Sequence, residues 1–368
     1  MKLIFSKKVT PEARAILVKN ILNQGIKSPY FTFLESNWKQ TEQFEYDFIA
    51  GIGSKAILEF SNQDLQVIDE FLAEQHGNWI FTHLNYDFLN SIYSINKKNN
   101  ETITDFSLAT FWVPETLITL KDGTLEIFAT SSFEFNLIED GNHFANLLED
   151  ETQPLLLKKV ALNEYKIAFE KIQSYLKRGD IYEVNYCIPF ISKVQNINLI
   201  DIYLKQRVLS PAPYSAFYKA NDSYLICASP EQFIQKKGDL ISCHPMKGTI
   251  KKSDDPIENA RLKNQLSSSE KEKAENVMIV DLTRNDLSKI ASQGSVNVRE
   301  LFGVYEFPQV YQMISTVEAQ LKDNTRFSSI LKALFPMGSM TGAPKLNAIK
   351  IIDEVECFSR ELFSGSIG

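Results

Sequence analysis

Lys247 has the sequence setting best suited to chemistry, in the segment P-M-K-G-T that starts at Pro245. Pro245 and Gly248 restrict and sharpen the backbone, so the amine between them can be held at a defined point. A lysine becomes a nucleophile or base when burial or a nearby charge lowers its pKa. Glu231 and Glu275 are carboxylates that could share such a site. The alternative is an ordinary surface lysine in a turn.

Three further motifs accompany this segment: S-P-E-Q-F ending at Phe233, A-E-N-V-M-I-V-D-L-T-R-N-D from Ala274 and F-P-M-G-S-M-T-G-A-P-K from Phe335. In this order the four motifs resemble the chorismate-utilising enzymes, which include anthranilate, aminodeoxychorismate and isochorismate synthases. The resemblance is dense from Gly179 to Gly368 and thin before it. P-M-K-G-T is similar to component I of aminodeoxychorismate synthase, because anthranilate synthases usually carry alanine at the lysine position.

The resemblance implies a reaction in which ammonia replaces the C4 hydroxyl of chorismate. Lys247 would attack C2 of the ring while Glu231 protonates the leaving hydroxyl, and ammonia would then enter at C4 and expel the lysine. Glu231 stands sixteen positions before Lys247, so a hairpin could bring both residues into one cleft. The runner-up is an anthranilate synthase component I. A catalytically silent subunit that binds chorismate or tryptophan is the alternative from another class.

Glu275 is the residue that the resemblance assigns to Mg²⁺, a cation that prefers carboxylate oxygens. Taken alone, Glu275 better suits an i,i+4 ion pair with Lys271 on a solvated helix face. Exposed helix amides and close backbone approach in the last motif suit a bound carboxylate. A P-loop is a poor alternative there, because its spacing is wrong. The predicted substrate-binding residues are Thr249, Gly338, Thr341, Gly342 and Lys345.

A second predicted site is a tryptophan pocket, which relatives form from a Leu-Glu-Ser strand end and a proline-rich segment. The matching residues are Leu34, Glu35, Ser36, Pro211 and Tyr214. An ordinary strand end followed by a turn is an equally good interpretation of these segments.

Three positions depart from the family pattern. Glu183 replaces the usual glutamine, where isochorismate-forming relatives carry a lysine that activates water, so the water-adding branch is disfavoured. Gln312 replaces a histidine that the resemblance links to elimination in anthranilate synthases, which favours the branch that keeps the pyruvyl group. Met337 occupies a position where the family usually has glycine.

The composition is ordinary for a globular protein, with 368 residues, 44% hydrophobic and 23% charged. A net charge of −7 disfavours nucleic acid as a partner, because its phosphates must be neutralised by cations. Four cysteines without a C-x-x-C pair, and no run of 18 apolar residues, predict a reduced, cytoplasmic protein with no membrane partner. No cysteine lies in a nucleophile-elbow sequence followed by a histidine, which a glutaminase would need. The resemblance therefore implies that ammonia comes from a glutamine amidotransferase subunit.

The resemblance implies an α+β fold with antiparallel β-sheets packed face to face and helices outside. Residues 1–150 are predicted to form a divergent N-terminal portion and residues 151–368 the chorismate-binding portion. Local patterns predict a hairpin turned at 121–123, a helix over 163–177 capped by Gly179, and a helix that begins with a capping box from Ser267 to Glu270. The range 77–93 is predicted as strand.

The last residues, E-L-F-S-G-S-I-G, lie within a motif that relatives continue into further strands, an arginine and a magnesium-binding glutamate. We therefore expect the chain to be a fragment of a longer enzyme. Glu275 alone is expected to hold Mg²⁺ weakly.

Overall fold

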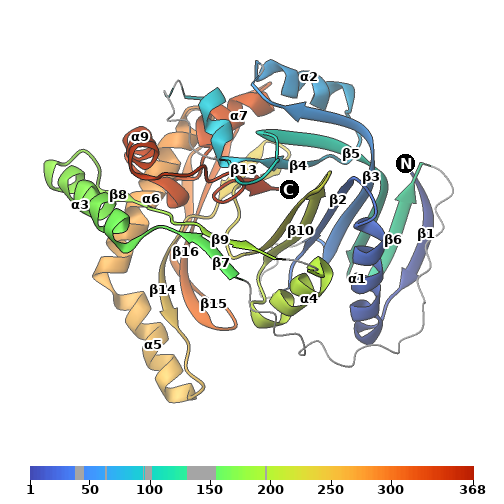
Figure 1. Ribbon diagram of the computed structural model, residues 1–368, viewed down its shortest axis with the longest axis horizontal. Coiled ribbons are helices and arrows are strands. Elements are labelled where there is room, and N and C mark those ends of the chain that lie inside the picture. The colour runs from blue at the N-terminus through green and yellow to red at the C-terminus, as the bar shows by residue number, and fades with distance from the viewer. Residues whose placement is uncertain (38–44, 63, 94, 96–101, 131–154, 195–196) are drawn as a thin grey trace.

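The structure is a computed structural model that describes residues 1–368 except 38–44, 63, 94, 96–101, 131–154 and 195–196. Within these described residues, two antiparallel sheets and their surrounding helices form most of the molecule (Figure 1). The predicted α+β fold built on antiparallel sheets is confirmed.

The larger sheet has the strand order β1-β6-β5-β3-β2-β10-β11, and β4 and β18 extend it beside β5. Asp122 and Gly123 turn the β5–β6 hairpin with positive φ angles of 48° and 69°, which confirms the predicted turn. The strands are β1 (Lys2–Lys8), β2 (Tyr30–Glu35), β3 (Phe48–Phe60), β4 (Phe81–Leu84), β5 (Ala109–Lys121), β6 (Thr124–Ala129), β10 (Tyr214–Ala220), β11 (Ser223–Ser229) and β18 (Ser366–Ile367).

The smaller sheet has β16 at its centre, paired with β13, β14 and β15, while β12 pairs with β13. Two short ribbons complete the pairing of the described strands, one between β8 and β17 and one between β7 and β9. The strands are β12 (Gln235–Lys237), β13 (Leu240–Cys243), β14 (Met246–Lys251), β15 (Asn297–Glu306), β16 (Val310–Gln320), β7 (Leu155–Lys159), β8 (Glu183–Val184), β9 (Phe190–Lys193) and β17 (Gly342–Ala343).

Helices cover both sheets, and two of them project from the body of the molecule (Figure 1). The projecting helices are α3 (Leu162–Arg178) and α5 (Pro256–Ser268). The others are α1 (Pro11–Gly25), α2 (Gln66–Glu74), a 3₁₀ helix η1 (Tyr86–Ser91), α4 (Leu199–Leu209), α6 (Glu270–Ser288), α7 (Phe327–Leu334), the one-turn α8 (Gly338–Thr341) and α9 (Lys345–Val355).

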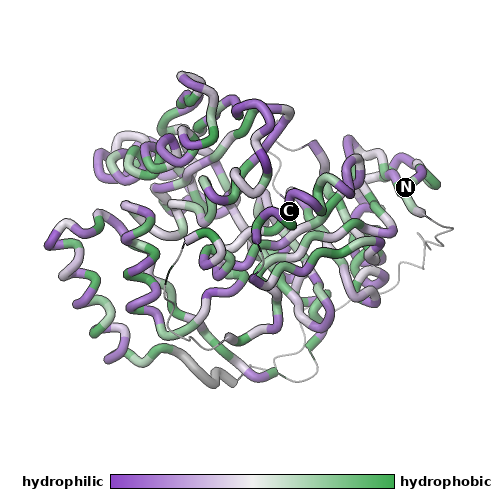
Figure 2. The backbone as a smooth tube through the Cα atoms, turned by 90° about the horizontal axis from the view of Figure 1, so that it is seen from above, coloured by the Kyte–Doolittle hydropathy of each residue, from purple (hydrophilic) through white to green (hydrophobic). Residues whose placement is uncertain are grey.

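Hydrophobic side chains from strands and helices form the core between these layers. Helices α1 and α4 pack on one face of the larger sheet, around Phe31, Phe33 and Phe217. Helix α7 contributes Leu331 to a cluster with the larger sheet and Ile330 to a cluster with the smaller sheet. Part of the contact between the two sheets is therefore made through a helix. Figure 2 shows hydrophobic residues concentrated along the central strands.

The boundary predicted at residue 150 lies outside the described residues. Strands β10 and β11, which follow it, pair with β2, which precedes it. The larger sheet thus joins both portions of the chain.

Local signals set the ends of several helices. Gly179 ends α3 in the left-handed conformation, as predicted. The predicted capping box from Ser267 to Glu270 is wrong by two residues. Helix α5 continues through Ser268, and the hydroxyl of Ser269 caps α6. The strand predicted over 77–93 is also wrong in part, since β4 ends at Leu84 and the Asn85 side chain then caps η1.

Candidate active site

Lys247 lies at an irregularity in β14, where the pairing with β16 shifts between Met246 and Thr249. Gly248 has a φ of 95°, which a residue with a side chain rarely adopts. A Cβ at this position would also lie 3.3 Å from the Cβ of Met313 on β16. Bulges of this kind redirect a side chain relative to its strand. The P-M-K-G-T sequence thus turns Lys247 out of the regular alternation of β14.

The amine of Lys247 forms an ion pair and hydrogen bond with Oε1 of Glu183. Both side chains are mostly shielded, with exposed fractions of 17% and 18%. Glu183 is held in the β8–β17 ribbon, where Gly342 pairs with Val184 and Ala343 with Glu183. A Cβ at Gly342 would lie 2.2 Å from the backbone oxygen of Glu183, so glycine permits this close approach. The last motif of the chain thereby positions the partner of Lys247.

Glu231 lies next to this pair, directly after β11. Burial raises the pKa of its carboxyl to about 7, while hydrogen bonds from Ser339 and the Met246 amide, and the charge of Lys247, act to lower it. Oε1 of Glu231 is buried and has no hydrogen-bond partner among the described residues. A carboxyl in these surroundings can hold a proton near neutral pH and give it to a bound molecule.

Glu231 opens onto a pocket of about 360 Å³ between the smaller sheet and the loop before α8. Its walls combine a few polar groups with apolar side chains, an arrangement typical of small-molecule sites. The lining residues are Glu231, Gln232, Phe233, Cys243, His244, Pro245, Ile279, Thr283, Asp286, Leu334, Met337, Gly338 and Ser339. The chain passes from the larger to the smaller sheet between Glu231 and Lys247, so a single hairpin does not join them.

Helix α6 contacts the backbone of Lys247 through Asn276. Asn276 is fully buried, donates from Nδ2 to the backbone oxygen of Lys247 at 3.4 Å and accepts from Ser315 Oγ at 2.6 Å. These two contacts connect β14, α6 and β16 at the position of the bulge. Asn276 stands directly after Glu275 in the quoted motif, but its type alone gave no signal of this role.

The other predicted substrate-binding residues occupy different settings. Lys345 is buried, with its amine 2.5 Å from Oδ2 of Asp286 and 3.1 Å from the Leu334 oxygen. Burial lowers the pKa of Lys345, and Asp286 opposes this effect. Thr341 is buried and donates to Met337 O at 3.0 Å. In this arrangement Lys345 and Thr341 satisfy their polar groups within the protein.

Gly338 and Thr249 lie closer to open space. Gly338 begins α8 and lines the pocket beside Glu231. Thr249 is exposed on β14, and its hydroxyl lies 2.6 Å from Oε1 of Gln312 on β16. The side chain that replaces the family histidine therefore faces the strand that carries Lys247.

Glu275 lies on α6 with 39% of its side chain exposed, and its Oε1 lies 3.6 Å from the amine of Lys271. No three histidine, cysteine or acidic side chains come together as a metal site anywhere in the described ranges. Glu275 is thus part of no cluster of three such side chains in the described residues, whereas Mg²⁺ needs six oxygens in near-octahedral geometry. The described residues do not form a complete magnesium site by themselves. Mg²⁺ stays a prediction.

The residues predicted as a tryptophan pocket meet where β2 pairs with β10. Leu34 is opposite Ala216, Glu35 is opposite Ser215, and Tyr214 begins β10 just after Pro211. Ser36 follows β2 and is buried. Burial raises the pKa of the Tyr214 hydroxyl to about 12.

Glu35 uses its carboxylate within the protein. Its Oε1 accepts hydrogen bonds from the Tyr203 hydroxyl at 2.8 Å and from Arg207 Nε at 2.6 Å, and Oε2 lies 3.8 Å from Arg14.

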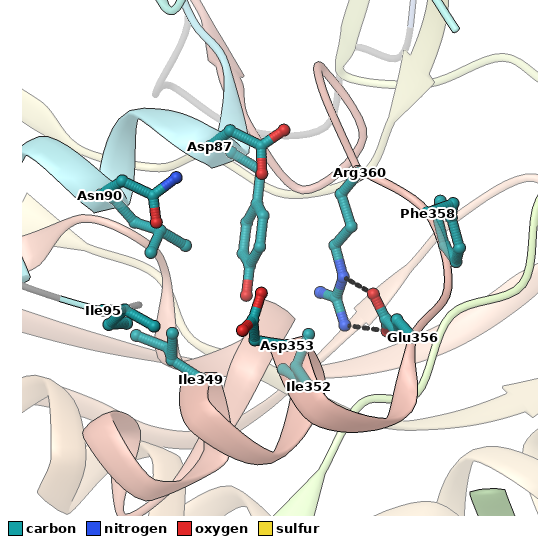
Figure 3. A pocket seen from close by; sticks show the side chains of 11 residues that line it. Asp87, Asn90, Ile95, Ile349, Ile352, Asp353, Glu356, Phe358 and Arg360 are labelled. Carbon is teal, nitrogen blue, oxygen red and sulfur yellow. Dashed lines mark hydrogen bonds and ion pairs between the residues drawn. The ribbon is translucent and has the colours of Figure 1, made fainter. Parts of the chain in front are cut away.

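A second pocket, of about 310 Å³, lies between η1 and α9 (Figure 3). In this pocket Arg360 makes two hydrogen bonds to Glu356, and both side chains are almost fully buried. Arg360 also donates to the backbone oxygens of Met340 and Asn185, and its guanidinium lies 4.8 Å from the centre of the Tyr86 ring. These contacts connect the segment after α9 to helix α8 and to the segment after β8.

Comparison with known proteins identifies the family. A model described as chorismate binding enzyme matches residues 28–368. The chain belongs to the chorismate-binding enzyme family. No helix in the described part of this family member is long and apolar enough to cross a membrane.

Two curated relatives show which activities are found among proteins similar in sequence to this chain. Aminodeoxychorismate synthase component 1 of Klebsiella aerogenes is 42% identical over 205 residues, which cover 56% of this chain and 45% of the relative. Anthranilate synthase component 1 of Bacillus subtilis is 35% identical over 257 residues, which cover 67% of this chain and 50% of the relative. The chain spans about half the length of these curated relatives.

Solved structures share the fold. Anthranilate synthase component I from Streptococcus pneumoniae aligns with a TM-score of 0.75 at 23% identity, over 90% of this chain and 81% of that chain. The menaquinone-specific isochorismate synthase MenF from Escherichia coli aligns with a TM-score of 0.71 at 14% identity, over 99% and 81% of the two chains. At these identities the likeness establishes architecture.

Proposed function

We propose that this chain is component I of an aminodeoxychorismate synthase, which exchanges the C4 hydroxyl of chorismate for an amino group. The observation that carries the proposal is the position of Lys247 on a bulge beside Glu231, whose carboxyl has a pKa of about 7. A nucleophilic amine and a protonated carboxyl are the two groups that a covalent displacement of a hydroxyl requires. The 42% identity to an aminodeoxychorismate synthase component 1 supports the same branch.

The proposed reaction has two displacements. The neutral Lys247 amine forms a bond to C2 as both ring double bonds shift and the C4–O bond breaks, and Glu231 gives its proton to the departing hydroxyl, which leaves as water. Ammonia then forms a bond to C4, both double bonds shift back and the C2–N bond breaks. The amine that was ammonia loses a proton to Glu231, which restores the acid. The sum is chorismate plus ammonia giving 4-amino-4-deoxychorismate plus water.

The ammonia is proposed to come from a separate glutamine amidotransferase subunit. Two relatives are named aminodeoxychorismate synthase component 1, which supports a second component. Mg²⁺ is proposed to anchor a carboxylate of the substrate with Glu275 as one ligand. Tryptophan is proposed to bind beside the β2–β10 pair, and calorimetric titration with tryptophan would test this.

The deciding experiment is incubation of the chain with chorismate, Mg²⁺ and ammonium, followed by mass spectrometry of the product. An aminated product that keeps the enolpyruvyl group is expected. Anthranilate, which lacks that group, would instead support the anthranilate synthase alternative that the Bacillus subtilis relative raises. Calorimetric binding of chorismate without any product would show a silent binding subunit and overturn the proposal.

A further inference from the structure

We infer that Glu183 is the positioning residue that takes the proton from the Lys247 ammonium and so produces the attacking amine. The inference rests on the proposed function and adds to it a second carboxylate with a separate role. Its starting point is the direct contact between Lys247 Nζ and Glu183 Oε1.

The mechanism needs such a proton acceptor. In the ion pair Lys247 is an ammonium, which has no lone pair and cannot attack carbon. Glu231 cannot accept this proton, because the same step requires Glu231 to be protonated and to act as the acid. Among the described residues, Glu183 is the carboxylate that touches the amine. The two carboxyl groups therefore divide the base and acid roles.

The surroundings of Glu183 suit a proton acceptor. Its Oε2 is buried without a hydrogen-bond partner in the described part of the chain, so no other donor stabilises its charge. The other titratable groups near the pair are Glu231, whose pKa the charge of Lys247 lowers, and Glu272, whose Oε2 would lie 3.1 Å from a Cβ at Gly248. Lys271, 3.9 Å from Glu272, partly offsets that second charge.

Substrate binding favours the transfer. A bound ring displaces water from a pair that is already mostly shielded, and an ion pair loses its advantage over a neutral pair as water is removed. The proton moves from Nζ to Oε1 of Glu183, which leaves a neutral amine and a neutral carboxylic acid. When the C2–N bond breaks in the second displacement, Lys247 leaves as a neutral amine and recovers that proton from Glu183. The site returns to its starting state.

Backbone contacts fix the separation of the two groups. Lys247 is placed by the β14 bulge and the Asn276 contact, and Glu183 by its pairing with Ala343 in the β8–β17 ribbon. Neither residue depends on a flexible surface loop for its position. The contact is therefore present before the substrate arrives.

The test compares Glu183→Gln with the wild-type chain by two measurements. The first is acetylation of Lys247 by acetic anhydride across a pH series, read by peptide mass spectrometry without chorismate. Loss of the carboxylate is expected to increase labelling of Lys247 at a given pH, because no counter-charge then stabilises its ammonium form. The second is amination with ammonium as the nitrogen source. Turnover is expected to fall about 100-fold with little change in KM, because a base is lost while binding groups remain.

The combination is diagnostic, since a merely structural defect would not make Lys247 easier to label while slowing turnover. Glu183→Asp, which keeps the charge, should restore labelling at the wild-type pH and part of the turnover. Glu258→Gln, which removes an exposed carboxylate paired with Arg261 on α5, serves as the control and should change neither measurement.

Unchanged labelling in Glu183→Gln, or amination at the wild-type rate, would overturn the assignment of Glu183 alone. A wild-type chain that gives neither aminated product nor a covalent adduct on Lys247 would overturn the proposed function, whatever the labelling shows. The two failures are thus distinguishable.

Discussion

At the residue scale, the site depends on one amine whose neighbours control where protons reside. Glu231 is largely shielded and neutral up to about pH 7, whereas Glu183 carries the charge that pairs with Lys247. Environment, rather than residue type, separates the roles of two glutamates. The sequence indicated Lys247 and Glu231 through their motifs, but it showed Glu183 only as a departure from a pattern. Its contact with Lys247 depends on a ribbon in which Glu183 pairs with Ala343, 160 positions later in the chain.

Replacement of Lys247 by alanine is expected to abolish amination at C4. No other amine can replace a nucleophile held on the bulge, and a partly exposed lysine contributes little to packing, so the fold should persist. Product formation by mass spectrometry and circular dichroism would check both points. Lys251→Ala is a matched control, because Lys251 is exposed on the same strand. Normal turnover by Lys247→Ala would end the covalent scheme.

The raised pKa of Glu231 predicts a pH dependence with a definite direction. Glu231 must be protonated to act as an acid, so kcat/KM for amination should fall as the pH rises through about 7. Ser339→Ala removes a hydrogen bond that lowers this pKa, so the alkaline fall should move to higher pH. Glu231→Gln should reduce turnover about 100-fold or more. A Ser339→Ala profile displaced to lower pH would contradict the assignment.

At the element scale, Gly342 decides whether the β8–β17 ribbon can close. A Cβ there would lie 2.2 Å from the Glu183 oxygen, so Gly342→Ala should push β8 away and weaken the Lys247–Glu183 contact. Thermal unfolding and the pH series of Lys247 labelling would detect the two effects. Gly294→Ala is the control, since Gly294 also has a positive φ but nothing within 4 Å, and it should cost only about 1 kcal/mol. Equal effects of the two variants would show that the close approach is unimportant.

Helix α6 carries the remaining acidic candidate. Glu275→Gln should raise the Mg²⁺ concentration needed for half-maximal amination, because it removes a charged oxygen from a cation that binds few protein groups. Glu270→Gln is the control, because the Glu270 side chain on the same helix is 90% exposed, and it should leave the magnesium titration unchanged. A magnesium titration identical to wild type in Glu275→Gln would identify Glu275 as a helix-face residue paired with Lys271.

Most elements could be predicted where a local signal marks them. The Asp122–Gly123 turn and the Gly179 cap are examples, because each requires a backbone conformation that few residues adopt. Adjacent signals were less decisive. Ser267 and Ser269 both offer capping hydroxyls, and the choice of Ser269 depends on where α5 ends. The 3₁₀ helix after β4 was missed because its short apolar run also fits a strand.

At the scale of the whole molecule, the sequence could not show that one sheet spans both halves of the chain. Strand β2 pairs with β3 on one side and with β10 on the other. Such pairing joins residues about 180 positions apart, and no local pattern reports it. As a consequence, one side chain connects both portions of the chain, because Glu35 on β2 pairs with Arg14 of α1 and with Arg207 of α4.

Glu35→Gln should therefore lower the free energy of unfolding of the whole chain. It removes the carboxylate that pairs with Arg207 and one of the two that pair with Arg14, which also lies 3.8 Å from Asp47. Breaking a fully buried pair costs about 3–5 kcal/mol, and about 2 kcal/mol is expected here because Arg14 and Arg207 are 24% and 18% exposed. Glu258→Gln, at an exposed pair, should leave the free energy of unfolding nearly unchanged.

Urea unfolding followed by two probes tests whether this loss is shared by the entire molecule. All three tryptophans precede residue 150, so their fluorescence reports the first portion, while far-ultraviolet circular dichroism also reports helices α3 to α9 of the second. Because the larger sheet joins both portions, the two probes should give one coincident transition, displaced to lower urea in Glu35→Gln. Two separate transitions, with only the fluorescence change moved by the substitution, would show instead that the portions on either side of residue 150 unfold as independent domains.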